Sequence, residues 1–74
     1  MTSRNIRARM AYHGLTSGEV ADKIGMAASS FSERLNGKTG WWLEEAVALT
    51  NYFRSLGDDI GVQELFEIDL LVNT

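Results

Sequence analysis

The chain has 74 residues with a formal net charge of −3, no cysteine and one histidine, so disulfides are excluded and neither a metal nor another cofactor is expected. A domain of this size buries only about 60% of the surface that its unfolded chain exposes, so a partner subunit is the expected supplement to its core. No apolar run approaches the roughly 20 residues that cross a bilayer, and the N-terminus lacks the apolar region of a signal peptide, so we expect a cytoplasmic protein without a membrane partner.

The first predicted helix begins near the N-terminus. Ser3 can serve as its N-cap, and Ile6 and Met10 lie about one turn apart, so they share the inner face of the helix. Gly14 then supplies the left-handed residue that commonly ends a helix. The pattern therefore predicts one short amphipathic helix before residue 14.

Two further short helices are predicted over the next twenty residues. The segment Thr16–Glu19 has the Ser/Thr-x-x-Glu form of a capping box and opens the second helix, which Gly25 ends after barely two turns. The third helix is expected over about residues 28–36, with Phe31 and Leu35 on its apolar stripe. A breaker segment over residues 36–40 follows it.

The second half of the chain predicts a longer fourth helix over about residues 42–56 and a short fifth helix over about 62–66. The expected inward stripe of the fourth helix is Leu43, Ala46, Val47, Leu49 (or Thr50) and Phe53. We expect Trp42 to seat this helix in the core and Trp41 to be partly exposed. Residues 67–72 suit either a strand or a continued helix. The predicted fold class is all-α, a bundle of four or five helices.

The C-terminal region holds more apolar side chains than a four-helix core needs. They are Ile60, Val62, Leu65, Phe66, Ile68, Leu70, Leu71 and Val72. We expect these side chains to form the surface of a homodimer. One domain is thus predicted, with its core in residues 1–57 and a dimerisation element in residues 58–74.

Charge is distributed unevenly along the chain. Residues 1–40 hold six cations and three anions, a balance of +3, and residues 41–74 hold one cation and seven anions, a balance of −6. A polyanion responds to the local field of the face that it meets rather than to the total charge. The cationic front half is therefore compatible with a nucleic-acid partner despite the acidic total.

The second and third predicted helices share a pattern that favours a helix-turn-helix. Its inward and turn positions are Val20, Ala21, Ile24, Gly25, Met26, Phe31 and Leu35. A small residue such as Ala21 lets two short helices approach closely, and Gly25 tolerates the positive φ of a tight connection. The alternative is a generic helical hairpin without a nucleic-acid partner.

With these residues the chain resembles the lambda-repressor-like family, the Cro and phage-repressor type of helix-turn-helix. The segments that carry the resemblance are LTSGEVADKIGM (15–26) and SSFSERLNGKT (29–39), followed by WLEE (42–45). The likeness covers about residues 4–56. It implies major-groove recognition and binding as a dimer to a near-palindromic operator. Two positions depart from the pattern, because Arg34 occupies a usually apolar position and Ala27 replaces the common Ser or Thr cap.

Carried over by position, the resemblance implies which side chains face DNA. The residues expected at base edges are Ala28, Ser29, Ser32 and Glu33. The residues expected at phosphates are Thr16, Ser17, Arg34, Asn36 and Lys38, and Arg7 and Arg9 are either further phosphate contacts or ordinary surface residues. Glu33 is the most discriminating of these, because a carboxylate can accept a hydrogen bond from cytosine N4.

The function expected from the sequence is that of a small transcriptional repressor that binds double-stranded DNA. An enzyme is not expected, because the chain has no cysteine, a single histidine and no glycine-rich phosphate loop. Stacking of Trp41 and Trp42 on single-stranded bases is a further alternative. The main alternative is a protein-interaction module on the same fold, such as an antitoxin or a phage accessory protein, that binds its partner through the acidic C-terminal half.

Overall fold

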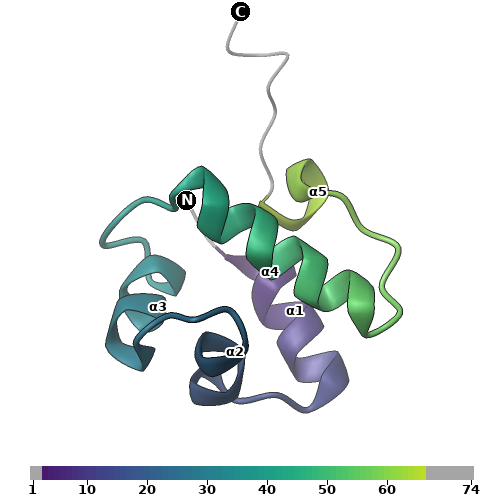
Figure 1. Ribbon diagram of the computed structural model, residues 1–74, viewed down its shortest axis with the longest axis horizontal. Helices are drawn as coiled ribbons and strands as arrows, with labels where there is room; N and C mark the ends of the chain where they lie inside the picture. The colour runs from purple at the N-terminus through teal and green to yellow at the C-terminus, as the bar shows by residue number, and fades with distance from the viewer. Residues whose placement is uncertain (1–2, 67–74) are drawn as a thin grey trace, which may run out of the picture.

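Five α-helices and the turns between them make up residues 3–66, the part of the chain that the computed structural model describes (Figure 1). The helices are α1 (Arg4–His13), α2 (Ser17–Lys23), α3 (Ala28–Leu35), α4 (Leu43–Ser55) and α5 (Val62–Phe66). No strand occurs among these residues. The predicted all-α class is confirmed, and the predicted boundaries of all five helices agree with the structure to within one or two residues.

Two of the helix ends depend on glycines in the left-handed region. Gly14 has φ 67°, and its N–H donates to the carbonyl of Ala11 while Leu15 N–H donates to that of Met10. Gly25 has φ 77° and is followed by a hydrogen bond from Met26 N–H to the carbonyl of Ala21. An L-residue with a Cβ would be strained at either φ, so both predicted stops are confirmed.

The caps of α1 and α2 differ because their backbones differ. Thr16 is extended (φ −92°, ψ 160°), and its hydroxyl accepts a hydrogen bond from the N–H of Glu19, as the capping box predicts. Ser3 occupies the N-cap position of α1, but its ψ is 46° and its side chain makes no capping hydrogen bond. The extended conformation normally aims the cap oxygen at the first turn, so the prediction that Ser3 caps α1 is wrong for its side chain.

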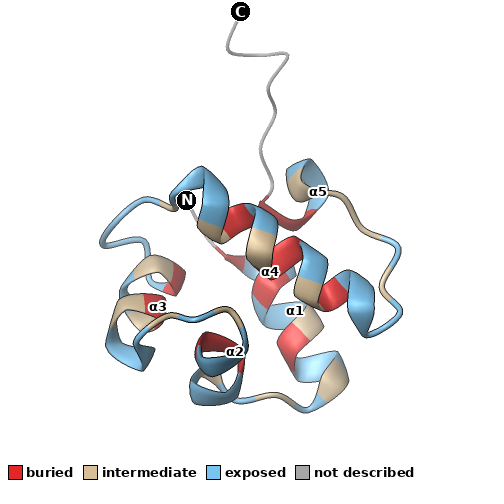
Figure 2. Ribbon diagram, in the orientation of Figure 1, coloured by how far each residue is buried: buried red, intermediate tan, exposed pale blue. Residues whose placement is uncertain are grey.

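The core draws on all five helices (Figure 2). Its buried apolar side chains are Ile6, Met10, Val20, Ala21, Phe31, Leu35, Ala46, Leu49, Phe53, Leu65 and Phe66. Ile24 and Met26 are half-buried and pack against this cluster. The inward positions predicted for α2, α3 and the turn between them are thus all at or against the core.

The fifth helix contributes to this core. Leu65 and Phe66 are 0% and 3% exposed, and α5 contacts both α1 and α4. Ile60 and Val62 are partly buried against the same cluster. Leu65 and Phe66 are thus buried inside one chain, which corrects their assignment to a homodimer surface. Ile60 and Val62 keep exposed area, and their part in a homodimer stays a prediction. Ile68, Leu70, Leu71 and Val72, the other four residues of that prediction, lie outside the described residues.

The prediction that Trp42 seats α4 in the core is wrong, whereas Trp41 is partly exposed as predicted and also packs against the core. Trp41 is half-buried and meets the rings of Phe31 and Phe66 edge-on, with centroids 5.7 and 5.1 Å away. Trp42 is 64% exposed. Its backbone is extended (φ −75°, ψ 148°), and successive side chains of extended backbone point to opposite sides, so only one of the pair can face the core.

The inward stripe of α4 is narrower than predicted. Ala46, Leu49, Thr50 and Phe53 are buried, whereas Leu43 is 75% exposed and Val47 is 43% exposed. Helix α5 contacts α4, and the ring of His13 on α1 stacks on Phe53 of α4, so the buried side of α4 is the side that carries Phe53. Leu43 and Val47 lie one turn apart on the uncovered side.

Candidate nucleic-acid interface

Helices α2 and α3 contact one another at the end of the molecule away from α5 (Figure 1). The short turn through Gly25 joins them, and Figure 1 shows that they point in different directions. Val20 and Ala21 of α2 are 0% and 1% exposed, and Phe31 of α3 is 0% exposed. The contact between the two helices is therefore closely packed. This packing fixes which side of α3 is turned toward solvent.

The outward side of α3 carries the side chains predicted at base edges. Ala28, Ser29 and Glu33 are exposed, and Ser32 is half-buried, whereas Phe31 and Leu35 on the opposite side are buried. The four predicted positions therefore share one accessible face. Apart from Glu33, this face is made of small side chains, so the helix backbone itself can approach a partner closely.

The C-terminal end of α3 gathers polar and cationic groups from two helices. Arg7 on α1 donates a 2.8 Å hydrogen bond to Asn36 Oδ1 and a 3.4 Å hydrogen bond to the carbonyl of Leu35. The ammonium of Lys38 is exposed beside them and makes no ion pair within residues 3–66. A cation at a helix C-terminus is favoured by the helix dipole. Sequence patterns left the role of Arg7 open, because its partners lie 28 and 29 residues away.

The guanidinium of Arg34 is bound by other side chains of the same chain. Its Nε donates a 2.7 Å hydrogen bond to Glu45 Oε1, its Nη1 donates to Thr39 Oγ1 at 2.9 Å, and its side chain is 13% exposed. The hydrogen bond to Glu45 raises the pKa of the guanidinium. The structure thus places the predicted phosphate ligand Arg34 against a carboxylate that neutralises its charge.

The start of α2 is also occupied by a carboxylate. The N–H and the hydroxyl of Thr16 donate to Glu19 Oε1 at 2.9 and 3.1 Å, and these hydrogen bonds lower the pKa of Glu19. Glu19 is exposed and Ser17 is half-buried. The two predicted phosphate contacts at this end, Thr16 and Ser17, therefore lie beside a negative charge, whereas Asn36 accepts a hydrogen bond from the cationic Arg7.

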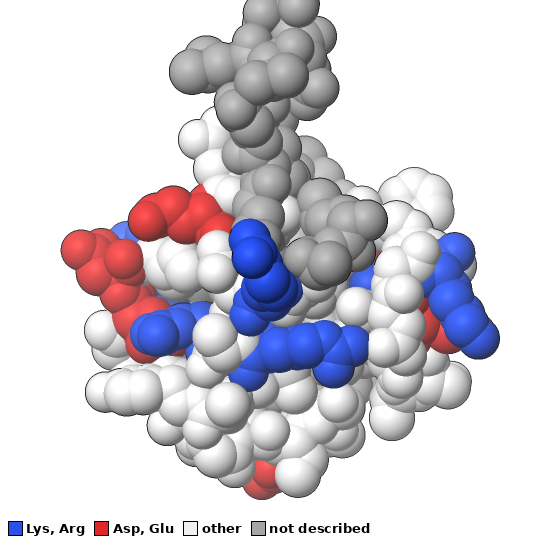
Figure 3. Space-filling view, turned by 180° about the vertical axis from the view of Figure 1, so that it is seen from behind, with Lys and Arg blue, Asp and Glu red and all other residues white. Residues whose placement is uncertain are grey.

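The cations form a band on the face opposite that of Figure 1. Figure 3 shows Lys and Arg side chains across this face, with most of the visible acidic side chains gathered at one edge. At the other end of α1, Arg9 and His13 pair with Asp58 at 3.2 and 2.9 Å, and Arg9 also lies over the ring of Tyr12. Arg9 is therefore engaged by an acidic residue, in contrast to Arg7.

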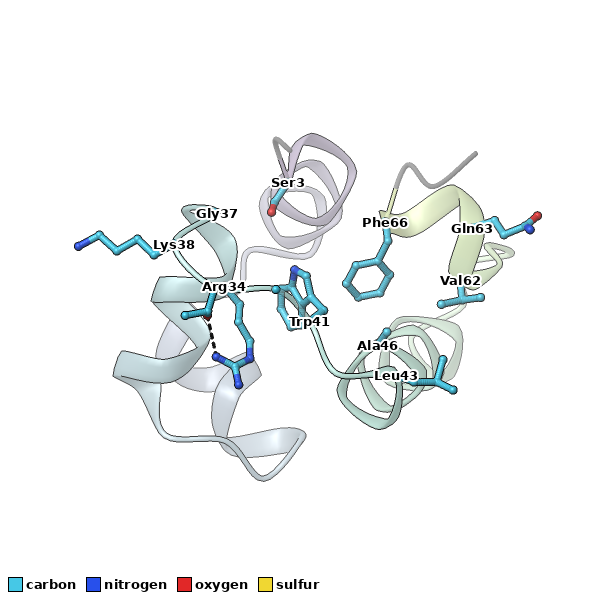
Figure 4. Close-up of a pocket in the computed structure, with 12 residues that line it drawn as sticks. Ser3, Arg34, Gly37, Lys38, Trp41, Leu43, Ala46, Val62, Gln63 and Phe66 are labelled. Carbon is cyan, nitrogen blue, oxygen red and sulfur yellow. Dashed lines mark hydrogen bonds between the residues drawn. The ribbon is translucent and has the colours of Figure 1, made fainter. Parts of the chain in front are cut away.

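A groove lies next to the cationic end of α3, between the loop that follows α3 and helices α4 and α5 (Figure 4). Its volume is about 530 Å³, and its walls are mainly apolar. The side chains of Trp41, Leu43, Ala46, Val62 and Phe66 line it, and Lys38 lies in the adjoining loop with its side chain directed away from the groove. The groove could not be predicted from the sequence, because its lining comes from three separate segments of the chain.

Comparisons with models of protein families, with curated proteins and with solved structures found no match. Among residues 3–66 no group of three or more His, Asp or Glu side chains is arranged to hold a metal ion. None of the helices in this range has the length and apolar character needed to traverse a bilayer; the longest, α4, has 13 residues.

Proposed function

We propose that this chain binds double-stranded DNA as a small transcription regulator of the lambda-repressor-like, helix-turn-helix type, with α3 entering the major groove. The observation that carries the proposal is the combination on α3 of an accessible face of small polar side chains with a cationic C-terminal end. The major groove of B-DNA admits an α-helix, and cations at the end of that helix would meet the adjacent backbone.

Three side chains are proposed to contact phosphates. Lys38 is the foremost, since no carboxylate within residues 3–66 pairs with it. Arg7 is proposed in addition, because its hydrogen bond to Asn36 holds both groups at the same end of α3. Arg34 is proposed to contribute less to phosphate binding than the sequence predicted, because contact with a phosphate would require its hydrogen bond to Glu45 to break.

Glu33 is proposed to supply most of the sequence preference. The exposed carboxylate lies on the same face as Ala28 and Ser29. A carboxylate accepts from cytosine N4 and is repelled by phosphate, so a well-placed contact discriminates among bases by about 1–3 kcal/mol. The serines bond several bases without strong preference. We therefore propose an operator in which one cytosine position is read strongly and its neighbours weakly.

The proposal is tested by the salt dependence of binding. Duplexes selected from a random pool are titrated with the full chain, and binding is followed by fluorescence anisotropy at several salt concentrations. Lys38→Ala is expected to weaken binding to every duplex and to reduce the slope of log Kobs against log salt by about one unit. Arg54→Ala is the matched control, because this exposed arginine lies in the last turn of α4 and not on or next to α3. The absence of any salt-dependent affinity in the unaltered chain would refute the proposal.

The second candidate function is a protein-interaction module on the same fold. The apolar groove and the exposed Leu43 and Val47 favour it, because exposed apolar surface next to a groove is typical of protein contacts. A chain without affinity for duplex DNA, and with binding to a protein partner that Leu43→Asp abolishes, would establish this second function in place of the first.

A further inference from the structure

The backbone at the end of α3 is fixed by two hydrogen bonds that close the helix. Gly37 N–H donates to the carbonyl of Arg34 at 3.2 Å, and Lys38 N–H donates to that of Glu33 at 3.0 Å. With Gly37 at φ 79°, this is the Schellman arrangement that ends many helices. It holds the C-cap residue Asn36 at φ −85° and ψ 0°. The direction in which the Asn36 side chain leaves the backbone is therefore set by the helix end.

The side chain of Arg7 on α1 determines which way the amide of Asn36 is turned. A guanidinium has only hydrogen-bond donors, so the atom that it meets must be an acceptor. Arg7 Nη2 lies 2.8 Å from Asn36 Oδ1 and 3.4 Å from the carbonyl oxygen of Leu35. The opposite orientation of the amide would set its NH2 group against the guanidinium, with two donors facing each other. The NH2 group of Asn36 is therefore turned away from Arg7.

On that other side the NH2 group of Asn36 meets Ser32. The two residues lie one turn apart on the same side of α3. Asn36 Nδ2 donates to Ser32 Oγ in a long hydrogen bond of 3.5 Å. Arg7, Asn36 and Ser32 thus form a chain of three groups whose hydrogen bonds are all donated in one direction, from α1 toward the outward face of α3.

We propose that Arg7 is a positioning residue for base recognition by Ser32. A serine hydroxyl can both donate and accept hydrogen bonds. Because the NH2 group of Asn36 donates to the Ser32 oxygen, the hydroxyl proton is directed away from Asn36 and is available to a base. Ser32 then presents a donor to the base edge. Ser29, which is exposed on the same face, is not part of this chain of groups and keeps both roles.

This role rests on the proposed DNA-binding function and gives Ser32 a definite preference. In the major groove guanine, adenine and thymine each offer at least one acceptor, whereas cytosine offers only the N4 donor. Ser32 is therefore expected to reject cytosine on the strand that it contacts, by about three- to tenfold for a single hydrogen bond. The adjacent Glu33 is proposed to select cytosine, so the two neighbours read opposite hydrogen-bond patterns.

The role of Arg7 is tested by the base preferences of variants of the full chain. Each variant selects duplexes from a random pool, and the position read by Ser32 is the one at which Ser32→Ala removes the discrimination against cytosine. Arg7→Met is expected to reduce this discrimination to less than about twofold, because the amide of Asn36 is no longer held. Lys38→Ala is the matched control. It removes one positive charge from the same end of α3 and is expected to weaken binding without changing this preference.

A second variant separates the direction of the hydrogen bonds from the stability of the helix end. Asn36→Asp keeps an acceptor for Arg7 but replaces the NH2 group by a carboxylate oxygen, which accepts the Ser32 proton. Ser32 then presents an acceptor, so its position is expected to favour cytosine and adenine, the bases with major-groove donors. A loss of stability alone would not invert a preference. Unchanged preferences in Arg7→Met and Asn36→Asp, in chains that still bind duplex DNA, would overturn the positioning role.

The chain of hydrogen bonds is also tested without DNA. In nuclear magnetic resonance spectra of the isotope-labelled full chain, the side-chain NH2 signals of Asn36 are expected to shift on Arg7→Met and on Ser32→Ala and to stay in place on Ser29→Ala. Signals that do not move would overturn the positioning role whatever the DNA affinity. The expected shifts in a chain that binds no duplex would instead refute the proposed function, and the base recognition by Ser32 with it.

Discussion

Arg34 and Glu45 join the end of α3 to the start of α4 through a 2.7 Å hydrogen bond between Nε and Oε1. The same carboxylate oxygen accepts a 3.0 Å hydrogen bond from the N–H of Trp42, the residue that precedes α4. The Glu45 side chain thus caps the start of α4 and also holds the end of α3 against it. These hydrogen bonds explain how the Arg34 side chain, which is only 13% exposed, is accommodated at the end of α3.

Loss of the charge on Glu45 is expected to change the acid sensitivity of the fold. Burial raises the pKa of Glu45, but the hydrogen bonds from Arg34 and from Trp42 N–H outweigh it, so the pKa lies below its ordinary value of 4.5. A carboxyl group with a lowered pKa contributes stability above its unfolded pKa, and the contribution is lost as the pH falls through the folded value. Glu45→Gln should therefore lower the urea midpoint at pH 7 and flatten its decline below about pH 4.5.

The control for this prediction is Glu44→Gln on the same turn. Glu44 is exposed, and the substitution removes the same charge from the chain. Urea midpoints measured between pH 7 and pH 3 should separate the two variants. Parallel pH profiles of Glu45→Gln and the unaltered chain would contradict a stabilising role for the contact with Arg34.

Asp58 is expected to be a main anchor of the loop between α4 and α5. Its side chain is 6% exposed and contacts both Arg9 and His13 on α1. Removal of a charged hydrogen-bond partner from such a site costs about 1–3 kcal/mol. Asp58→Asn should lower the free energy of unfolding by this amount, measured by urea denaturation at pH 7. Asp59→Asn, at the exposed neighbouring residue, should leave it nearly unchanged; equal effects would contradict the anchoring role.

Two glycines in and after α2 are expected to respond to alanine in opposite directions. Gly25 has φ 77°, where a Cβ costs roughly 1–2 kcal/mol, so Gly25→Ala should destabilise the fold by about that amount. Gly18 lies within α2, does not have a positive φ, and has no atom within 4 Å of an added Cβ. Gly18→Ala should therefore stabilise the chain by about 0.5–1 kcal/mol. Thermal unfolding midpoints that move in the same direction would show that the turn is not constrained as described.

Leu65 is expected to be essential to the stability of a single chain. It is 0% exposed, and replacement of a buried leucine by alanine costs about 2–5 kcal/mol. Leu65→Ala should lower the free energy of unfolding by this amount independently of protein concentration. Leu56→Ala, at a side chain that is 40% exposed, should cost well under half as much. A loss that appears only at low concentration would instead place Leu65 in a contact between copies.

The local features of this protein could be predicted from its sequence because they depend on residues close together along the chain. The capping box of α2 involves Thr16 and Glu19, and the stops at Gly14 and Gly25 depend on the conformation of one residue each. The apolar spacing of α2 and α3 likewise predicted which of their sides is buried. These features determined where α1 and α2 end, where α2 begins, and which face of α3 is exposed.

The tertiary structure decided what depends on residues distant along the chain. Only the packing of α5 shows that Leu65 and Phe66 are core residues, and only the approach of Phe31 and Phe66 shows which tryptophan faces inward. The partner of Arg34 lies 11 residues away and that of His13 lies 45 residues away. Each of these contacts joins two separate segments of the fold, so the periodicity within a single helix gives no sign of it.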